Sequence, residues 1–158
     1  MKNTVIYPGT FDPITYGHLD IIERVASIFD TLILAVSCSS HKKTMFSVTE
    51  RIQLIKEETK HLNNVIVKGF SGLTIDFAKD HNSNILIRSI RSILDFEYEH
   101  NMFNINNHLM NNLETIFFLP SPQLSFISSS GIKKIFKHGG DISSFIPKSV
   151  FIAFCKKK

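Results

Sequence analysis

Cysteine is scarce in this 158-residue sequence, and long apolar runs are absent. The two cysteines, Cys38 and Cys155, are isolated, so they form neither a disulfide framework nor the spacing of a metal or redox site. No run approaches the roughly 20 apolar residues that a membrane-spanning helix needs, and the amino-terminal segment lacks the apolar middle of a signal peptide. We therefore expect a cytoplasmic protein without a membrane partner.

Two common phosphate-binding motifs are also missing. The sequence contains neither the Walker loop pattern nor the GxGxxG pattern of dinucleotide-binding folds. It has no stripe of aromatic residues alternating with basic ones, so we expect no nucleic-acid partner. The formal net charge of +4, part of which comes from Lys156–Lys158, fits a solvated tail and equally fits a small polyanionic substrate.

Short apolar runs alternate with helical patterns along the chain. Such runs, rich in β-branched residues, are typical of strands buried on both faces of a parallel sheet. The longest helical pattern covers Ile93–Met110, Ser47 and Glu50 form a capping box, and Pro147 is expected to begin a short terminal helix. We predict a doubly wound, Rossmann-like α/β fold, a five-stranded parallel sheet with helices on both faces, as a single domain over residues 1–158. The expected strands are Thr4–Tyr7, Leu32–Val36, Val65–Val67, Ile85–Ile87 and Thr115–Leu119.

The stretch YPGTFDPITYGH, residues 7–18, follows the first predicted strand. In a doubly wound sheet, ligands bind where strands end at the carboxyl edge. The prolines stiffen this turn and the glycines permit close backbone approach, which places Gly17 and His18 in the first turn of the next helix. Free N–H groups and the helix dipole favour a phosphate there, and the histidine can add a donor. A helix-capping or packing role is the alternative for His18.

Phosphate-binding residue types also follow three other predicted strands. The pair Lys42–Lys43 follows the second strand, and Arg88 and Arg91 follow the fourth. Arginine is the preferred fork for phosphate. The segment Ile127–Ser130 follows the fifth strand and would place hydroxyl and N–H groups at another helix amino terminus. A solvated loop is the alternative for the lysines, and simple N-capping for the serines. Their convergence on one edge predicts a substrate with several phosphates.

The TxGH motif at residues 15–18 and the ISSS motif at residues 127–130 resemble those of the nucleotidyltransferase superfamily. The closer match is the phosphopantetheine adenylyltransferase family. It rests on YPGTFDPITYGH, on KK at 42–43 followed by MF at 45–46, on LIRSIR at 86–91, on DFEYE at 95–99, on NxHLM ending at Met110 and on SFISSS at 125–130. These motifs span nearly the whole chain in the order expected for that family.

The resemblance implies the penultimate step of coenzyme A synthesis. The phosphate of 4′-phosphopantetheine would attack the α-phosphate of ATP in line, without a covalent intermediate, giving dephospho-coenzyme A and pyrophosphate. The family also implies Mg²⁺ and a homohexamer. The sequence has no cluster of paired carboxylates that would form a dedicated metal site, so we expect Mg²⁺ to be held mainly by the ATP phosphates. Because the nucleophile is already an anion, positioning and charge stabilisation can carry such a reaction.

Site residues are implied by matching positions. The resemblance gives catalytic roles to His18, Thr10, Lys42 and Arg91. It places phosphopantetheine against Thr10, Lys42, Thr74, Arg88 and Asn106. It places ATP against Thr10, Phe11, His18, Ser89, Ile90, Arg91, Glu99, Leu124, Ser125, Phe126, Ile127, Ser128, Ser129 and Ser130. From the residues alone, an exposed salt-bridge glutamate is the alternative for Glu99.

Four positions depart from the family pattern. Ser89 replaces a usual glycine and would be strained if its φ were positive. Leu124 replaces a frequent tryptophan, so an aromatic ring that could stack on adenine is lost, and Asn107 replaces a frequent arginine. Gly131 lies at a helical position, where glycine weakens a helix by about 1 kcal/mol relative to alanine.

Two other functions are compatible with parts of the sequence. One is a different small nucleotidyltransferase that joins another phosphate-bearing acceptor to a nucleotide. The other is a nucleotide-binding or RNA-binding module without catalysis, which only the basic charge balance and the lysine tail support.

Overall fold

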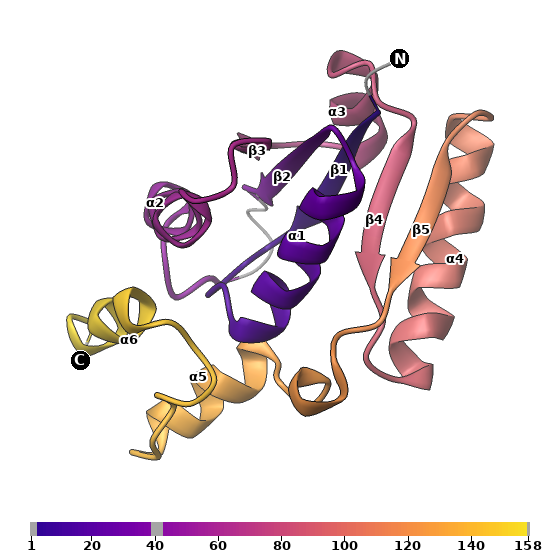
Figure 1. The fold of residues 1–158 in the computed structure, drawn as a ribbon. Helices are drawn as coiled ribbons and strands as arrows, with labels where there is room; N and C mark the ends of the chain where they lie inside the picture. The colour runs from indigo at the N-terminus through magenta and orange to yellow at the C-terminus, as the bar shows by residue number, and fades with distance from the viewer. Residues whose placement is uncertain (1–2, 39–42, 158) are drawn as a thin grey trace.

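The computed structural model of the chain describes residues 3–38 and 43–157. Its centre is an all-parallel, five-stranded sheet in the order β3-β2-β1-β4-β5 (Figure 1). The strands are β1 (Thr4–Gly9), β2 (Thr31–Ser37), β3 (Val65–Phe70), β4 (Ile85–Ser89) and β5 (Glu114–Phe118). The predicted fold class and its five strands are confirmed, with small shifts at the strand ends.

The helices follow the predicted patterns with two differences. They are α1 (Tyr16–Ile28), α2 (Val48–Thr59), α3 (Thr74–Asp80), α4 (Ile93–Leu109), α5 (Ser129–Lys137) and α6 (Lys148–Cys155), with a 3₁₀ turn, η1, at Pro122–Leu124. The capping box is confirmed, since the Ser47 N–H donates to Glu50 Oε2 at 2.7 Å and the Glu50 N–H donates to Ser47 Oγ at 3.2 Å. The short helix α3 was not predicted, because its sequence shows no distinct apolar stripe. Pro147 is the N-cap of α6 rather than its first helical residue, so that prediction was wrong by one position.

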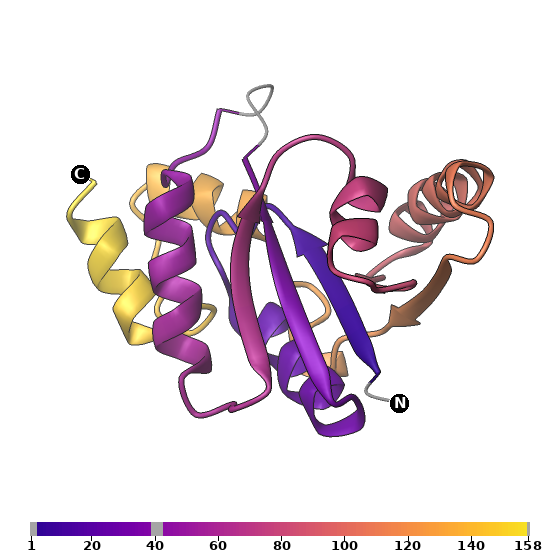
Figure 2. The ribbon, with the colours of Figure 1, turned by 90° about the horizontal axis from the view of Figure 1, so that it is seen from above.

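Alternating side chains of the strands divide the core between the two faces of the sheet. On one face, Val5 and Leu34 belong to a cluster with residues of α1, α2 and α6. On the other face, Ile6 and Ala35 pack with Ile75 of α3. Figure 2 shows α2 and α6 side by side, with α3 across the sheet from them. Helices therefore cover both faces, as predicted.

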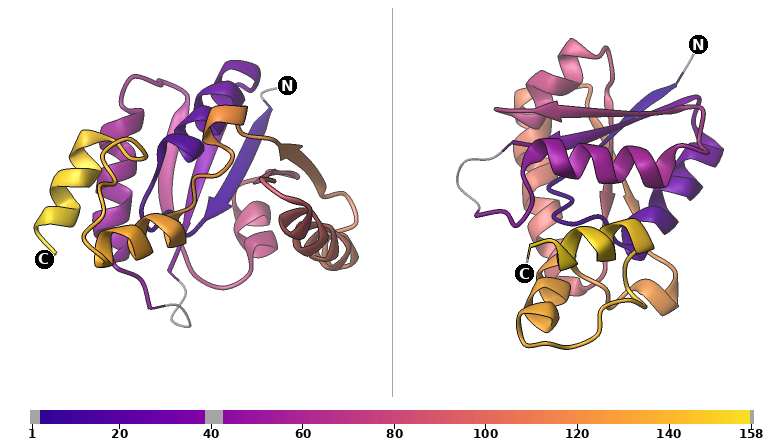
Figure 3. Two further views of the ribbon diagram at one scale, coloured as in Figure 1. Left: turned by 90° about the horizontal axis from the view of Figure 1, so that it is seen from below. Right: turned by 90° about the vertical axis from the view of Figure 1, so that its left-hand side faces the viewer.

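The carboxyl-terminal helices α5 and α6 lie near the edge of the sheet where the strands end. The Phe154 ring of α6 lies 4.8 Å from the Phe136 ring of α5 and 5.3 Å from the Phe46 ring, centroid to centroid. Figure 3 shows α6 between α2 and α5. These aromatic contacts hold α5 below the carboxyl ends of the strands (Figure 1). In the described part of the chain, the helices are all too short or too polar to span a bilayer.

The order of the strands reverses at β1, which pairs with β2 on one side and with β4 on the other. In open parallel sheets, the connections that leave neighbouring strands at such a point diverge and leave a crevice at the carboxyl ends. The segments at the ends of β1 and β4 are two of the four for which the sequence predicts phosphate binding.

Candidate active site

The turn after β1 has a left-handed backbone at Phe11. The φ angle of this residue is +47°, in a region that non-glycine residues rarely adopt. Its buried ring packs edge-on against His18, with the ring centroids 5.1 Å apart. A Cβ atom on Gly9 would lie 2.8 Å from the Phe11 ring, so glycine at that position makes room for the ring. The strained backbone needs surrounding contacts to keep it in place.

Arg51 of α2 supplies one set of these contacts. The residue is only 3% exposed. From Nη1 it donates to the carbonyl of Thr10 at 2.6 Å and to that of Ser37 at 2.9 Å. From Nε it donates to the carbonyl of Phe46 at 3.1 Å. A single guanidinium thus ties the carboxyl ends of β1 and β2 to the start of α2.

Asp12 supplies the second set. Its buried carboxylate accepts hydrogen bonds from the backbone N–H groups of Met45 and Phe46, each at 2.9 Å. It also forms an ion pair with the Lys133 ammonium of α5 at 2.6 Å. Arg51 therefore fixes Thr10, the residue before Phe11. Asp12, the residue after it, is fixed by the segment before α2 and by α5.

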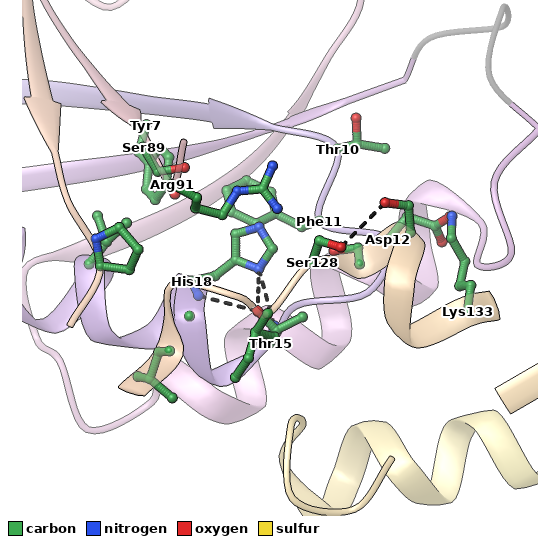
Figure 4. Close-up of a pocket in the computed structure, with 17 residues that line it drawn as sticks. Tyr7, Thr10, Phe11, Asp12, Thr15, His18, Ser89, Arg91, Ser128 and Lys133 are labelled. Atoms are coloured by element: carbon green, nitrogen blue, oxygen red, sulfur yellow. Dashed lines mark hydrogen bonds and ion pairs between the residues drawn. The ribbon is translucent and has the colours of Figure 1, made fainter. Parts of the chain in front are cut away.

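His18 is the third residue of α1, and it takes part in the capping of that helix. Thr15 Oγ1 accepts from the His18 N–H at 3.3 Å, and His18 Nδ1 accepts from the Thr15 N–H at 3.2 Å. Because Nδ1 is an acceptor, the neutral ring carries its proton on Nε2. Figure 4 shows Thr15 on one side of the ring and Arg91 on the other. The capping interpretation of His18 is confirmed, and Nε2 stays available for a ligand.

The electrostatic surroundings keep His18 uncharged. Its pKa is lowered to about 4, mainly by burial and further by the positive charge of Arg91. The residue keeps a partly exposed surface because its ring opens onto a cavity, while the protein surrounds it on the other sides. At neutral pH the ring therefore offers an N–H donor without a formal charge.

A first cavity of about 370 Å³ lies at the carboxyl ends of β1 and β4. It combines the turn after β1, the start of α1, the end of β4 and the amino terminus of α5 (Figure 4). Ser128 is the N-cap of α5, and its Oγ accepts from the Gly131 N–H at 3.1 Å. The lining residues are Tyr7, Thr10, Phe11, Asp12, Thr15, Gly17, His18, Ile21, Ser89, Arg91, Pro120, Leu124, Ile127, Ser128, Ser129, Ser130 and Lys133. Two helix amino termini and two cations make this cavity suitable for phosphates.

A second cavity of about 280 Å³ adjoins the first. The two share Tyr7, Thr10, Phe11, His18 and Ser89. The remaining lining residues of the second cavity are Pro8, Gly9, Ser37, Phe70, Thr74, Arg88 and Glu99. His18 thus stands where two ligands could meet.

Arg88 is fixed in the second cavity by a forked ion pair. Its Nε and Nη2 donate to the two carboxylate oxygens of Glu99 at 2.6 and 2.5 Å, and its Nη1 donates to the Pro8 carbonyl at 3.0 Å. The Glu99 side chain is 11% exposed, so this is not the exposed salt bridge considered from the sequence. Such an arrangement orients the guanidinium while leaving some of its donors for a ligand.

Most of the predicted site residues line the two cavities, but some do not. Glu99 lines the second cavity rather than the first, and Ile90 is buried. Asn106, Ser125 and Phe126 line neither cavity, although Phe126 borders a small apolar crevice beside the first. Lys42 lies outside the described residues.

Two of the departures from the family pattern have local consequences. Ser89 is not among the described non-glycine residues with positive φ, so the strain considered for it does not arise. At Gly131, a Cβ atom would lie 2.9 Å from Ser128 Oγ, the oxygen that caps α5. Glycine therefore leaves room for the capping hydroxyl at the floor of the first cavity.

Sequence reasoning missed three charged residues that shape the site: Asp12, Arg51 and Lys133. Asp12 and Arg51 act across the fold, on segments far apart in the sequence. Lys133 lies four residues after Ser129, a spacing that places both on one face of a helix. That spacing was the available signal for Lys133.

The carboxylates of the two cavities are already engaged. Asp12 is held by Lys133 and two N–H groups, and Glu99 is held by Arg88. Among the described residues, no group of three or more histidine, cysteine or acidic side chains could hold a metal ion. The donor set therefore suits a metal that arrives with its own phosphate ligands better than a protein cage.

Comparison with known proteins gives a consistent result. The cytidylyltransferase-like family model matches residues 6–135. Two curated proteins named phosphopantetheine adenylyltransferase, from Proteus mirabilis strain HI4320 and Photorhabdus laumondii, are 53% and 54% identical to the chain over 99% of its length and 98% of theirs. A crystal structure from Vibrio parahaemolyticus, assigned as a nicotinate-nucleotide adenylyltransferase, matches with a TM-score of 0.71 at 20% identity, covering 98% of this chain and 99% of its own. The last similarity shows the fold alone.

A cavity with phosphate-binding termini, a matching family model and full-length relatives at more than half identity agree with the motifs of the sequence. The chain is a nucleotidyltransferase of the cytidylyltransferase-like family, and within it belongs to the phosphopantetheine adenylyltransferases.

Proposed function

We propose that this chain transfers the adenylyl group of ATP to 4′-phosphopantetheine, giving dephospho-coenzyme A and pyrophosphate. The observation that carries the proposal is the pair of adjoining cavities with His18 between them. A transferase with two anionic substrates needs two such sites that meet at the reacting atom. The names of the curated relatives identify the acceptor.

The first cavity receives ATP. The amino termini of α1 and α5 offer N–H groups to the phosphates, and Ser128–Ser130 add hydroxyl groups. Arg91 lines the same cavity and is held by Asp95 at 3.1 Å. Leu124 and Ile127 supply an apolar surface for the nucleoside.

The second cavity receives 4′-phosphopantetheine. Arg88 binds its phosphate, with Thr10 at the junction of the cavities and Thr74 toward the pantetheine chain. Glu99 acts here by orienting Arg88. Lys42 stays a predicted ligand of the same phosphate, while Asn106 is left as a prediction without a place in either cavity.

The reaction is a direct in-line displacement without a covalent intermediate. A phosphate oxygen of the acceptor attacks the α-phosphorus of ATP, and the bond from that phosphorus to the oxygen bridging to the β-phosphorus breaks. The Nε2–H of His18 and the Thr10 hydroxyl stabilise the charge that grows on the α-phosphate oxygens. No side chain needs to remove a proton, because the attacking oxygen is already anionic.

We infer that Mg²⁺ enters with ATP, held by its phosphates and by water. The engaged state of Asp12 and Glu99 supports this inference. When bound, the metal neutralises phosphate charge in the transition state. The chain contributes the termini of α1 and α5 and the cations that hold the same phosphates. A cytoplasmic location and the absence of a nucleic-acid partner stay predictions.

Pyrophosphate release tests the proposed function directly. We expect the protein to release pyrophosphate from ATP and Mg²⁺ only when 4′-phosphopantetheine is present, with dephospho-coenzyme A formed in equal amount. A different nucleotidyltransferase would require another phosphate-bearing acceptor. A binding module without catalysis would release no pyrophosphate with any acceptor.

Replacing Arg88 by alanine is expected to raise the KM for 4′-phosphopantetheine about 10- to 100-fold, the range for losing a hydrogen bond to a charged group. The KM for ATP should change little, because Arg88 lines only the second cavity. Steady-state kinetics with each substrate varied in turn measures both values.

The Arg88→Ala variant also leaves the Glu99 carboxylate without its partner. The double variant Arg88→Ala/Glu99→Gln removes that charge and serves as the matched control. If the double variant regains the parent KM, repulsion by Glu99 explains the loss, and Arg88 does not bind the acceptor phosphate.

We further propose that the chain assembles as a homohexamer through α4. Large apolar side chains of this helix are exposed in the single chain, Leu94 to 77%. An exposed apolar surface of this kind is typical of protein interfaces. The exposed apolar residues of α4 are Ile93, Leu94, Phe96, Tyr98, Ile105 and Leu109.

Leu94→Asp is expected to shift the native mass, measured by analytical ultracentrifugation, from a hexamer to smaller species. An aspartate in the first turn of α4 does not oppose helix formation, so the change acts on the surface. Ile28→Asp, at an exposed apolar residue at the end of α1, is the control and should keep the parent mass. An unchanged mass for Leu94→Asp would exclude this face from assembly.

A further inference from the structure

Asp20 is a charged residue of α1 that lines neither of the two cavities and has no part in the proposed reaction. It lies two residues after His18, and its side chain is 15% exposed. The Ser121 hydroxyl donates to Asp20 Oδ1 at 2.6 Å, and the Ser121 N–H donates to Asp20 Oδ2 at 2.9 Å. Each carboxylate oxygen thus holds one donor of a residue that lies 101 positions later in the chain.

Arg24, one turn further along α1, adds to this link. Its Nη1 donates to the Leu119 carbonyl at 2.8 Å and to Asp20 Oδ2 at 3.2 Å. Partial burial acts to raise the pKa of Asp20, but the hydrogen bonds from Ser121 and Arg24 outweigh it and hold that pKa below its ordinary value. The carboxylate is therefore ionised at neutral pH, the state in which both of its oxygens accept hydrogen bonds.

The segment that this carboxylate holds forms the nucleoside wall of the first cavity. Pro120 and Leu124 line that cavity and not the second. The Ser121 carbonyl accepts from the Leu124 N–H at 2.8 Å, and the Leu124 carbonyl accepts from the Ile127 N–H at 3.1 Å. The turn η1 connects β5 to α5 (Figure 1), and the Leu124 carbonyl oxygen lies 3.4 Å from the place that a Cβ atom on Gly17 would take. A displacement of Ser121 would therefore move Leu124 relative to the first turn of α1.

The phosphate end of the same cavity is anchored by other contacts. Ser129 Oγ, on the first residue of α5, donates to the Pro13 carbonyl at 2.7 Å. The ion pair between Asp12 and Lys133 attaches the next turn of α5 to the segment after β1. Because Asp20 takes no part in these contacts, we expect the loss of its carboxylate to loosen the nucleoside wall and to leave the amino terminus of α5 in place.

We propose that Asp20 is a positioning residue for ATP, which acts through Ser121 to hold η1 and Leu124 where they meet the nucleoside. This inference rests on the proposed function, in which the first cavity receives ATP. A turn that is held in its binding conformation before the nucleotide arrives loses less conformational entropy on binding. If only a fraction of the molecules has this conformation, the apparent affinity falls by that fraction.

Two other roles for Asp20 make different predictions. A carboxylate that only stabilises the fold would, when removed, weaken the binding of both substrates alike. A carboxylate that acts only through its charge repels the anionic nucleotide, so its removal would lower the KM for ATP. The positioning role predicts a raised KM, and it predicts it for ATP alone.

Steady-state kinetics of Asp20→Ala tests the proposal. We expect the KM for ATP to rise about 10-fold, the low end of the range for losing hydrogen bonds to a charged group. The KM for 4′-phosphopantetheine and the turnover at saturating substrates should stay within about threefold of the parent values, because the lost interaction is shared by the ground state and the transition state. Glu23→Gln removes an exposed carboxylate of the same helix that does not contact Ser121, and this control should match the parent.

Calorimetry adds a measurement that does not need turnover. In Asp20→Ala, we expect the binding of AMP, which carries the nucleoside, to weaken about 10-fold. The binding of pyrophosphate, which lacks the nucleoside, should stay within about threefold of the parent value, because α5 keeps its own anchors. Equal weakening of both ligands would contradict a role at the nucleoside wall.

Variants of Ser121 show whether Asp20 acts through this residue. Ser121→Ala removes the hydrogen bond to Oδ1 and keeps the one from the backbone N–H, so we expect a smaller rise in the KM for ATP. In the double variant Asp20→Ala/Ser121→Ala, the rise should equal that of Asp20→Ala alone rather than the product of the two single effects. Thermal unfolding checks that each variant is folded.

Several outcomes would overturn the proposal. They are a KM for ATP in Asp20→Ala that equals or falls below that of the parent, an equal rise in both KM values, and independent effects in the double variant. If Asp20→Ala does not fold, a parent-like KM for ATP in Ser121→Ala overturns the proposal, and a raised KM for ATP alone supports it. A parent protein that makes no dephospho-coenzyme A would instead overturn the proposed function, which is a separate measurement.

Discussion

His18→Ala is expected to lower turnover about 100- to 1,000-fold, the loss found when one preorganised donor to a developing oxyanion is removed. The reason is the position of His18, which borders both cavities and whose neutral ring carries its proton on Nε2. Turnover at saturating concentrations of both substrates measures the effect. An ordinary histidine becomes protonated as the pH falls through 6.5, whereas the pKa of His18 is about 4. Protonation of His18 should therefore not lower the turnover of the parent enzyme near pH 6.5.

His18→Gln is the matched variant for this prediction. Glutamine is a common partner in a capping box, so it can accept from the Thr15 N–H and preserve the start of α1. We expect its thermal unfolding to match the parent, while turnover falls because the amide does not place a donor where Nε2 stands. Full turnover in His18→Ala would remove the histidine from the reaction, and equal loss of stability and turnover in both variants would indicate a purely structural role.

Much of the fold could be predicted because its signals are local. Each strand is a short β-branched run, and the capping box at Ser47 and Glu50 marks a helix start within four residues. The seven-residue α3 was missed because so short a helix shows less than two full turns of periodicity. Pro147 was placed one position too far into α6, within the usual uncertainty of helix ends.

The site could be predicted in part. A physical cause separates the residues that the sequence located from those that it missed. Residues at or beyond the ends of strands, such as His18, Arg88 and Ser129, were located because a parallel sheet brings strand ends to one edge. Glu99 was assigned to ATP by resemblance, whereas the structure pairs it with Arg88 across α4 and β4. The role of Arg51 could not be predicted, because no sequence pattern marks a buried arginine that donates hydrogen bonds to backbone carbonyls.

Arg51→Met is expected to lower the free energy of unfolding by about 3 kcal/mol, because it takes the guanidinium donors from one buried and two partly buried carbonyl groups. Those groups belong to Thr10, Ser37 and Phe46, at distances of 2.6, 2.9 and 3.1 Å from the guanidinium. For a chain of this size, the change corresponds to roughly 6–12 °C in the temperature of unfolding. Methionine keeps most of the side-chain volume, so the effect reports on the hydrogen bonds rather than on a cavity.

Two further variants isolate the cause. Arg51→Lys keeps the charge, but a single ammonium cannot reach three carbonyls as a planar fork does, so we expect it to lose most of the same stability. Arg24→Met removes a partly exposed arginine that bonds Asp20 and the Leu119 carbonyl, and we expect a loss of stability below about 1 kcal/mol.

Because Arg51 holds the Thr10 carbonyl beside the strained Phe11, the Arg51→Met protein that remains folded should also show a raised KM for both substrates. An unfolding temperature equal to that of the parent would mean that the turn after β1 keeps its shape without Arg51, and that Phe11 is held by its own packing.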